Sequence, residues 1–391
     1  MNSAPRNKPN LLSVAWIGHG DFGDEVMAYV MRSFLKSLGM EKLTYYEAGP
    51  EPRFIGKNDL FAPALHRHDT RSVVKKIFDA FALPYFDALV IGGGSIFHSA
   101  NSIKWKHEIT RKMKYGNRNA FTACVGVSLG PFATKNDEAA CGKLLDEIDI
   151  VILRDESSYA IAKSISRNPN IHTSFDSSFL LQDIRFQQMK IKKPLQRKTV
   201  GIILVYGTEA TASYSEECLI STYTRIVEHT LKKDHDVMLL TLYTGSSFQD
   251  RRINKEIQRR INQPDRVRMH EFGGDITKTI EALSNCDVII SMRLHGIIFA
   301  YALGIPFISI GYNPKNRFFC TSVHYPERFT FEIEILSDIR PLLDTFDELC
   351  QQDRSVFAES EPVEKISSIV RHNFDLFGKA LRRHLLQAGV L

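Results

Sequence analysis

Short apolar runs alternate with longer, partly polar segments along the first half of the chain. A parallel strand buried on both faces reads as such a run, whereas a covering helix repeats its apolar residues about every 3.6 positions. The predicted elements are strands over 11–17, 87–91, 120–127, 149–153 and 171–175, and helices up to about 38 and over 71–83, 103–114, 137–147 and 157–164. This alternation predicts an α/β domain with a doubly wound parallel sheet.

The same alternation begins again at Thr199. Its predicted elements are strands over 199–206, 236–243, 267–272, 287–291 and 306–310, and helices over 215–231, 249–261, 276–283 and 297–303. The stretch 182–198 between the two series is polar and basic and contains a proline, as expected for a linker. Two such series predict two Rossmann-like domains that face each other across a cleft, which we assign to residues 1–190 and 198–355.

The end of the chain differs from both series. We predict a polar loop over 311–317 and a helix over 338–350 that is capped by Ser337. The final segment, 356–391, carries apolar residues at helical spacing. They are Val363, Ile366, Ile369, Val370, Phe374, Phe377, Leu381 and Leu385. The stripe predicts a core helix that packs back on the first domain, and a helix lying on a membrane surface is the alternative.

Composition indicates an ordinary globular protein. Of 391 residues, 43% are apolar and 24% charged, and a net charge of +5 is too small to argue for nucleic acid as a partner. The six cysteines include no Cys-x-x-Cys pair, which favours a reducing cytoplasm. The first apolar run is far shorter than the about 20 residues of a membrane span. We expect a cytoplasmic protein without a signal peptide or transmembrane helix, whose membrane role, if it has one, is peripheral.

Candidate chemistry lies where strands end. Ligands of open α/β sheets bind at the carboxyl ends of the strands, where helix amino ends present N–H groups to anions. Arg293, His295 and Gly296 follow the strand predicted over 287–291. An arginine there can hold a carboxylate or phosphate in a bidentate fork, and a histidine two residues away can deliver a proton. The alternative is an arginine in an ion pair and a histidine that caps a helix.

Two glycine-rich turns follow earlier strands. The first contains Gly18, Gly20 and Gly23 beside Asp21 and Asp24. These two carboxylates would repel a pyrophosphate, which favours a site for sugar hydroxyls over a phosphate cradle, with a simple turn at the helix start as the alternative. The second is Gly92-Gly93-Gly94-Ser95. Three consecutive glycines are costly to order, so close approach of a ligand to the backbone is favoured over a purely steric turn.

Arg154 has a comparable position in the first half of the chain. It follows the strand predicted over 149–153, at the start of a helix, as Arg293 follows its own strand. We therefore treat it as a second candidate for binding an anion. A surface ion pair with Asp155 or Glu156 is the alternative.

Taken together, these turns resemble the polysaccharide pyruvyl transferase family. The matching segments are Gly20-Asp21-Phe22-Gly23-Asp24-Glu25, Gly92-Gly93-Gly94-Ser95-Ile96-Phe97, Arg154-Asp155-Glu156-Ser157, Phe175-Asp176, Arg293-Leu294-His295-Gly296, Phe299-Ala300, Gly304-Ile305-Pro306 and Tyr312-Asn313-Pro314-Lys315. They occur in the family's order, and the segment that begins at Arg293 is the most specific. The chain departs from the family at Asp21, where the pattern Gly-Asn-x-Gly-Asp commonly has Asn.

The resemblance implies a fold like that of the two-domain GT-B glycosyltransferases, with the acceptor on the first domain and the donor on the second. It implies transfer of pyruvate from phosphoenolpyruvate onto a sugar of a polysaccharide or its lipid-linked precursor, as a ketal. The implied phosphoenolpyruvate contacts are Arg154, Arg293, Leu294 and Gly296, with His295 as the proton donor and Asp24 near the reacting centre. Candidates for acceptor or loop contacts are Asp21, Gly93, Gly94, Ser95, Tyr312 and Lys315.

The chemistry of phosphoenolpyruvate agrees with these residue types. Its C2 becomes electrophilic only when C3 is protonated, which requires a general acid, and two guanidinium groups can hold its three negative charges. No step needs a metal or a redox cofactor, so we expect none. The expected partners are phosphoenolpyruvate and a sugar, lipid-linked saccharide or polysaccharide of an exopolysaccharide, capsule or other cell-envelope polymer. A lipid-linked acceptor would bring the enzyme to the inner face of the membrane.

Other functions remain open on the sequence. A glycosyltransferase that uses a nucleotide sugar would share the two-domain architecture. A non-catalytic sugar-binding protein of the same fold would not need a general acid beside two arginines. A dehydrogenase that uses NAD is disfavoured, because neither glycine turn has the full dinucleotide context.

Overall fold

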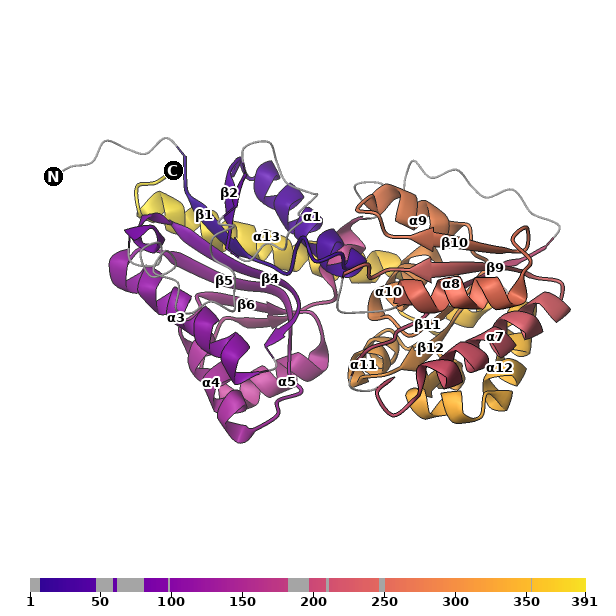
Figure 1. The fold of residues 1–391 in the computed structure, drawn as a ribbon. Coiled ribbons are helices and arrows are strands. Elements are labelled where there is room, and N and C mark those ends of the chain that lie inside the picture. The colour runs from indigo at the N-terminus through magenta and orange to yellow at the C-terminus, as the bar shows by residue number, and fades with distance from the viewer. Residues whose placement is uncertain are drawn as a thin grey trace. The chain divides into compact units, whose positions relative to one another are not determined.

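The computed structural model describes residues 8–46, 59–61, 81–97, 99–181, 197–208, 211–245, 250–352 and 354–391. The linker predicted over 182–198 and the helix predicted over 71–83 lie mostly outside these residues. The chain divides into two compact units. The first consists of Met1–His19, Asp24–Leu181 and Glu364–Leu391, and the second of Gly20–Gly23 and Gln182–Val363. Each unit is built around its own β-sheet (Figure 1).

The first unit holds a seven-stranded sheet with the strand order β3-β2-β1-β4-β5-β6-β7. Its strands are β1 (Leu11–Val14), β2 (Leu43–Tyr45), β3 (Leu60–Phe61), β4 (Ala88–Phe97), β5 (Phe121–Leu129), β6 (Ile150–Leu153) and β7 (Ile171–Thr173). All neighbouring strands pair in parallel. Every residue of β1, β5 and β6 is buried, as expected for apolar strands that are covered on both faces.

Helices cover both faces of this sheet. They are α1 (Phe22–Ser37), α3 (Ala100–Gly116), α4 (Lys135–Asp146), α5 (Glu156–Ile165) and α13 (Val363–Gln387), with 3-10 turns η1 (Leu83–Tyr85) and η2 (Ser177–Leu180). Figure 1 shows α1 and α13 on one side of the sheet and α3 and α4 on the other. Side chains of Ser99, Thr134 and Asp155 accept hydrogen bonds from first-turn N–H groups, so α3, α4 and α5 begin where these caps stand.

The last helix, α13, packs into the first unit through its apolar stripe. The rings of Phe374 and Phe377 lie against Phe34 of α1, with centroid distances of 5.0 Å and 5.9 Å. Gly378 permits this close approach, because a Cβ atom there would lie 2.9 Å from the Phe34 ring. The end of the chain therefore contributes to the core of the first unit.

The second unit holds a six-stranded parallel sheet with the strand order β10-β9-β8-β11-β12-β13. Its strands are β8 (Thr199–Ile203), β9 (Asp236–Thr241), β10 (Val267–Glu271), β11 (Val288–Ser291), β12 (Phe307–Gly311) and β13 (Thr330–Glu332). Its helices are α7 (Glu216–Lys232), α8 (Asp250–Ile261), α9 (Ile276–Ser284), α10 (Leu294–Leu303), α11 (Pro314–Ser322) and α12 (Arg340–Gln351), with 3-10 turns η5 (Glu327–Phe329), η6 (Ile333–Ser337) and η7 (Arg354–Phe357). Counted from the start of each unit, six strands in both sheets follow the Rossmann order 3-2-1-4-5-6. This confirms the predicted pair of doubly wound domains.

The segment Gly20–Gly23 belongs to the second unit, although the predicted first domain, 1–190, includes it. Backbone hydrogen bonds attach it beyond the end of β9: the N–H of Phe22 donates to the carbonyl of Leu242, and the N–H of Thr244 donates to Gly20, both at 2.9 Å. The Phe22 side chain is fully buried, with ring centroids of Phe272 and Phe299 at 5.4 Å and 4.9 Å. The packing of Phe22 explains why the boundary between the two units lies within the first glycine-rich turn.

Two predictions near the end of the second unit are wrong. The loop predicted over 311–317 is instead the end of β12 followed by α11, which begins with Pro314 after Asn313 as its cap. Proline is favoured at the first position of a helix, because it has no N–H to leave without a partner. Ser337 does not cap α12, since this helix begins at Arg340 with Ile339 in the cap position.

Candidate functional site

Arg293 lies at the junction between β11 and α10 in the second unit. It occupies the N-cap position of α10, where the Ser291 hydroxyl accepts its N–H at 3.1 Å and donates to its carbonyl at 2.9 Å. Strand β11 pairs with β8, which places Arg293 at the point where the strand order of this sheet reverses. Such switch points are where open α/β sheets bind ligands.

Gly296 has a steric role at the same junction. A Cβ atom at Gly296 would lie 2.2 Å from the Ser291 hydroxyl oxygen and 2.7 Å from Cδ1 of Ile203 on β8. The absence of a side chain therefore lets α10 begin directly against the strands. Leu294 and His295 form the first turn of this helix and are half-buried.

The guanidinium group of Arg293 lies among acidic and aromatic side chains. It is 8% exposed, and its Nε donates to Oδ2 of Asp250 at 3.0 Å. Its Nη1 lies 3.9 Å from Oδ2 of Asp21, and its Cζ lies 5.2 Å from the centre of the Tyr243 ring. Burial is the largest single influence and lowers the pKa of Arg293, but the charges of Asp250, Tyr312 and Asp21 and the hydrogen bond to Asp250 together outweigh it, so the net effect raises this pKa. The group therefore stays cationic.

The segment Gly20–Gly23 brings a second set of predicted residues to this place. The Asp21 carboxylate accepts the N–H of Gly23 at 2.9 Å, and Asp21 forms a β-bridge with Tyr243. Gly23 faces His295 so closely that a Cβ atom at Gly23 would lie 1.7 Å from the ring Nδ1. Asp21, Arg293 and His295, predicted from distant parts of the sequence, thus form one cluster in the second unit.

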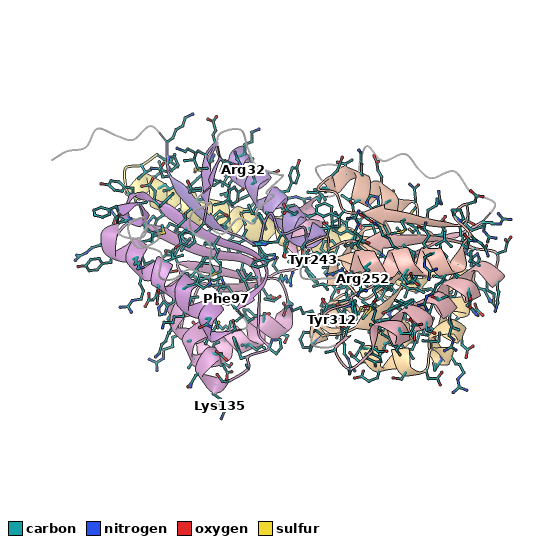
Figure 2. The ribbon with its side chains drawn as sticks, viewed as in Figure 1. Arg32, Phe97, Lys135, Tyr243, Arg252 and Tyr312 are labelled. Carbon is teal, nitrogen blue, oxygen red and sulfur yellow. The ribbon has the colours of Figure 1, made fainter. Side chains whose placement is uncertain are left out.

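Tyr312 and Lys315 lie beside this cluster at the start of α11. Tyr312 is half-buried and acts electrostatically on Arg293. The Lys315 N–H donates to the side chain of Asn313, and buried Asn316 donates to the carbonyl of Met292, which fixes α11 against the end of β11. Figure 2 shows Tyr243 and Tyr312 at the same edge of the second unit.

Arg154 lies in the first unit, directly after β6. It is 7% exposed; its Nε donates to the Ser128 hydroxyl at 2.7 Å and its Nη1 to Oδ2 of Asp176 at 2.8 Å. The alternative of a surface ion pair with Asp155 or Glu156 does not apply: Arg154 is buried, and Asp155 caps α5. In strand order β6 is the sixth strand of its sheet, whereas β11 is the fourth. The two arginines are therefore not in equivalent topological positions.

Asp24, Gly93 and Gly94 meet elsewhere in the first unit. Gly93 and Gly94 have positive φ angles of 73° and 72°, which only glycine adopts without strain. A Cβ atom at Gly94 would lie 2.6 Å from Oδ1 of Asp24, and one at Gly93 would lie 3.6 Å from Met27. Side chains of α1 therefore lie against the glycine run. A small cavity beside Gly93 is lined partly by Met27. The Ser95 side chain lies outside the described residues.

Sequence reasoning missed Asp250, Tyr243 and Phe22. Asp250 stands at the first position of α8, where an acidic residue is common for reasons of helix electrostatics alone, so the sequence carried no signal for it. Within the parts of the chain that the structure describes, no group of His, Cys, Asp and Glu could hold a metal ion. In those same parts, none of the helices has the length and apolar character needed to span a membrane.

Solved structures with the same fold include enzymes that act on nucleotide sugars. UDP-GlcNAc 2-epimerase from Neisseria meningitidis, bound to UDP-GlcNAc, matches with a TM-score of 0.62 at 11% identity over 93% of this chain and 99% of that chain. Sucrose-phosphate synthase from Thermosynechococcus elongatus matches at 0.58 and 14% identity over 97% and 100%. HepE from Anabaena, in complex with UDP and glucose, matches at 0.56 and 12% identity over 93% and 99%. These likenesses establish a GT-B-type fold.

The sequence itself indicates the family. Residues 21–314 match the family described as polysaccharide pyruvyl transferase. The match begins at Asp21 and includes Arg154, Arg293 and His295. The chain belongs to the polysaccharide pyruvyl transferase family, and it is a transferase of polysaccharide modification.

Proposed function

We propose that this transferase moves pyruvate from phosphoenolpyruvate onto two hydroxyls of one sugar, in a polysaccharide or its lipid-linked precursor, and forms a ketal. The observation that carries the proposal is the cluster in the second unit. A buried cationic Arg293 and a histidine two residues later stand at the switch point of a Rossmann sheet. The reaction needs a cationic group that binds the anionic donor and a group that donates a proton, whereas a protein that only binds an anion needs no proton donor.

The donor's negative charges suit the two buried arginines. Phosphoenolpyruvate carries a carboxylate and a phosphate, which Arg293 and Arg154 hold in this proposal, with Leu294 and Gly296 presenting the first turn of α10 to the donor. Guanidinium groups bind both anions through paired N–H donors. Because Arg293 and Arg154 are 8% and 7% exposed, their interaction with an anion is weakened less by water than that of a surface arginine. The same charges stabilise the phosphate as it departs.

His295 supplies the proton in this reaction. Transfer of its proton to C3 turns the methylene into a methyl group and makes C2 electrophilic. One sugar hydroxyl forms a bond to C2 and loses its proton, the bond between C2 and the phosphate oxygen breaks, and a second hydroxyl closes the ketal. The two hydroxyl protons balance the proton gained by C3 and the proton taken up with inorganic phosphate. Asp24 assists the first deprotonation.

The acceptor contacts are drawn from the glycine-rich turns and the start of α11. Asp21, Gly93, Gly94, Ser95, Tyr312 and Lys315 are the candidates. Carboxylates and a tyrosine hydroxyl bind sugar hydroxyls through hydrogen bonds. A lipid-linked acceptor would place the protein in the cytoplasm, at the inner face of the membrane.

A glycosyltransferase that uses a nucleotide sugar is the second candidate. It is favoured by the solved structures of the same fold that were crystallised with UDP or a UDP-sugar. The two candidates differ in the donor, which makes donor binding the deciding observation.

Thermal stability with each donor distinguishes the candidates. Phosphoenolpyruvate at a hundred times its dissociation constant should stabilise the wild type by about 2.7 kcal/mol. The stabilisation should be lost in Arg293→Ala and kept in the control Arg266→Ala, which removes an arginine paired with Asp236 on β9. Stabilisation by UDP-glucose, with no response to phosphoenolpyruvate, would refute the proposal in favour of the glycosyltransferase.

A further inference from the structure

Asp250 connects three parts of the second unit through one carboxylate. Its Oδ2 accepts hydrogen bonds from Nε and Nη2 of Arg293, and its Oδ1 accepts the backbone N–H of Tyr206 at 2.8 Å. Tyr206 follows β8, Arg293 follows β11, and Asp250 begins α8. Both carboxylate oxygens therefore have partners, and Asp250 is 1% exposed.

These contacts decide how Arg293 is oriented. A guanidinium group has two edges that can bind an anion in a bidentate way: the Nε–Nη2 edge along the side chain and the Nη1–Nη2 edge at its end. Asp250 engages the first edge. Nη1, which belongs to the end edge, lies 3.9 Å from Oδ2 of Asp21. Cζ of the group lies over the Tyr243 ring, 5.2 Å from its centre.

Stability alone explains the Asp250–Arg293 pair poorly. Removing two charges from water costs about as much free energy as their attraction returns, so a buried ion pair contributes little that packed apolar residues could not supply. A flexible arginine side chain, however, gains a single orientation when a fixed carboxylate holds one edge. Asp250 is fixed, because the Tyr206 N–H holds its other oxygen.

We infer that Asp250 is a positioning residue for this transferase: it holds the Nε–Nη2 edge of Arg293 so that the end edge meets the anionic group of the donor. This inference rests on the proposed function in one respect, the identity of the anion. The orientation of Arg293 is independent of it. Arg293 then binds the donor through Nη1 and Nη2, at the place beside Asp21, and not through the side edge.

Two variants and one control test this role. Asp250→Asn keeps the shape and one acceptor oxygen but removes the charge, and Asp250→Ala removes both. Asp236→Asn is the control, because Asp236 accepts Nε of Arg266 at 2.6 Å in a more exposed aspartate–arginine pair on β9 of the same unit. Circular dichroism and thermal melting establish that each variant is folded before binding is measured.

The first measurement observes the guanidinium group directly. In protein labelled with nitrogen-15 arginine, the Nε–H signal of Arg293 is assigned by its absence in Arg293→Lys. We expect this proton to exchange slowly with water in the wild type and in Asp236→Asn, and to exchange at least about tenfold faster in Asp250→Ala, because the buried acceptor is gone. Equal exchange in the wild type and in folded Asp250→Ala would overturn the inference, whatever the donor is.

The second measurement is the dissociation constant of phosphoenolpyruvate by calorimetry. We expect an increase of about tenfold or more in Asp250→Asn, a larger one in Asp250→Ala, and no further effect of Asp250→Ala in an Arg293→Ala background. Unchanged affinity in both folded Asp250 variants, or effects of Asp250 and Arg293 that simply add, would overturn the inference. If the wild type fails to bind phosphoenolpyruvate while the Nε–H signal depends on Asp250, the donor proposal is wrong and the positioning role stands.

Discussion

Replacing Asp21 by Asn should strengthen binding of the anionic donor. Asp21 stands where the family commonly has Asn, and its Oδ2 lies 3.9 Å from Nη1 of Arg293. A donor anion that reaches this edge of Arg293 must approach a carboxylate. Asn keeps a side-chain oxygen that can accept the Gly23 N–H, which Asp21 accepts at 2.9 Å, so the turn is preserved and the charge alone is removed.

The size of the effect follows from the exposure of Asp21 and from an assumed separation of about 4 Å between its carboxylate and a donor anion bound at Nη1. Two unit charges about 4 Å apart interact by about 1 kcal/mol in water and about 4 kcal/mol at an effective dielectric constant of 20. The Asp21 side chain is 23% exposed, which places it between these limits, and we take the lower part of the range. A gain of about 1–2 kcal/mol corresponds to about 5- to 30-fold tighter binding. The gain should shrink as salt is added, because salt screens exposed charges.

Calorimetric titration with phosphoenolpyruvate at low and high salt measures this effect. Asp344→Asn is the matched control, since it removes the same charge from an exposed position on α12. Tighter binding in Asp21→Asn alone, most pronounced at low salt, is the expected result. Unchanged or weaker binding in folded Asp21→Asn would refute the electrostatic reasoning. This holds provided that replacing Arg293 in the same variant abolishes donor binding, which shows that the donor binds at Arg293.

Three further predictions concern other parts of the chain. Gly23→Ala should lower turnover by more than about tenfold, because the new Cβ atom would lie 1.7 Å from Nδ1 of His295. Near wild-type kinetics would count against close packing of this turn on the histidine. Phe374→Ala should destabilise the first unit by about 3–5 kcal/mol in urea unfolding, because the ring is 2% exposed and packs on Phe34. A loss of unfolding free energy below about 1 kcal/mol would show that α13 adds little to that core. Burial lowers the pKa of His270 from 6.5, so the unfolded chain gains a proton that the folded protein lacks and stability should fall as the pH drops below that value. His270→Gln should therefore lose less unfolding free energy than the wild type between roughly pH 7.5 and pH 5.5, and an equal loss would contradict this assignment.

The strands of both sheets could be predicted because their burial imposes one composition. Val288–Ser291 must be apolar or small to lie between two neighbouring strands under helices, and that requirement is visible in the sequence. The position of Arg293 and His295 at a strand end followed from the same run. The helix at Pro314 had a local signal, an Asn followed by Pro, which a reading of 311–317 as merely polar overlooked.

The remainder of the site depends on contacts between distant residues. Phe22 looks like any apolar residue at a helix start. Its burial against Phe272 and Phe299, with the backbone hydrogen bonds to Leu242 and Thr244, places Gly20–Gly23 in the second unit. Asp250 likewise reads as an ordinary acid in the first turn of a helix. Its role depends on the ends of β8 and β11 lying side by side, which the strand order determines and local sequence does not.

The use of phosphoenolpyruvate as the pyruvyl donor is tested most directly by following the donor and the product together. The wild type is incubated with phosphoenolpyruvate and a panel of sugars and lipid-linked saccharides, and phosphorus and proton NMR record inorganic phosphate and the ketal methyl group. We expect both to appear in equal amounts with at least one acceptor, and neither to appear with Arg293→Ala. Phosphoenolpyruvate left intact, while a nucleotide sugar is consumed with the same acceptors, would contradict the proposed function.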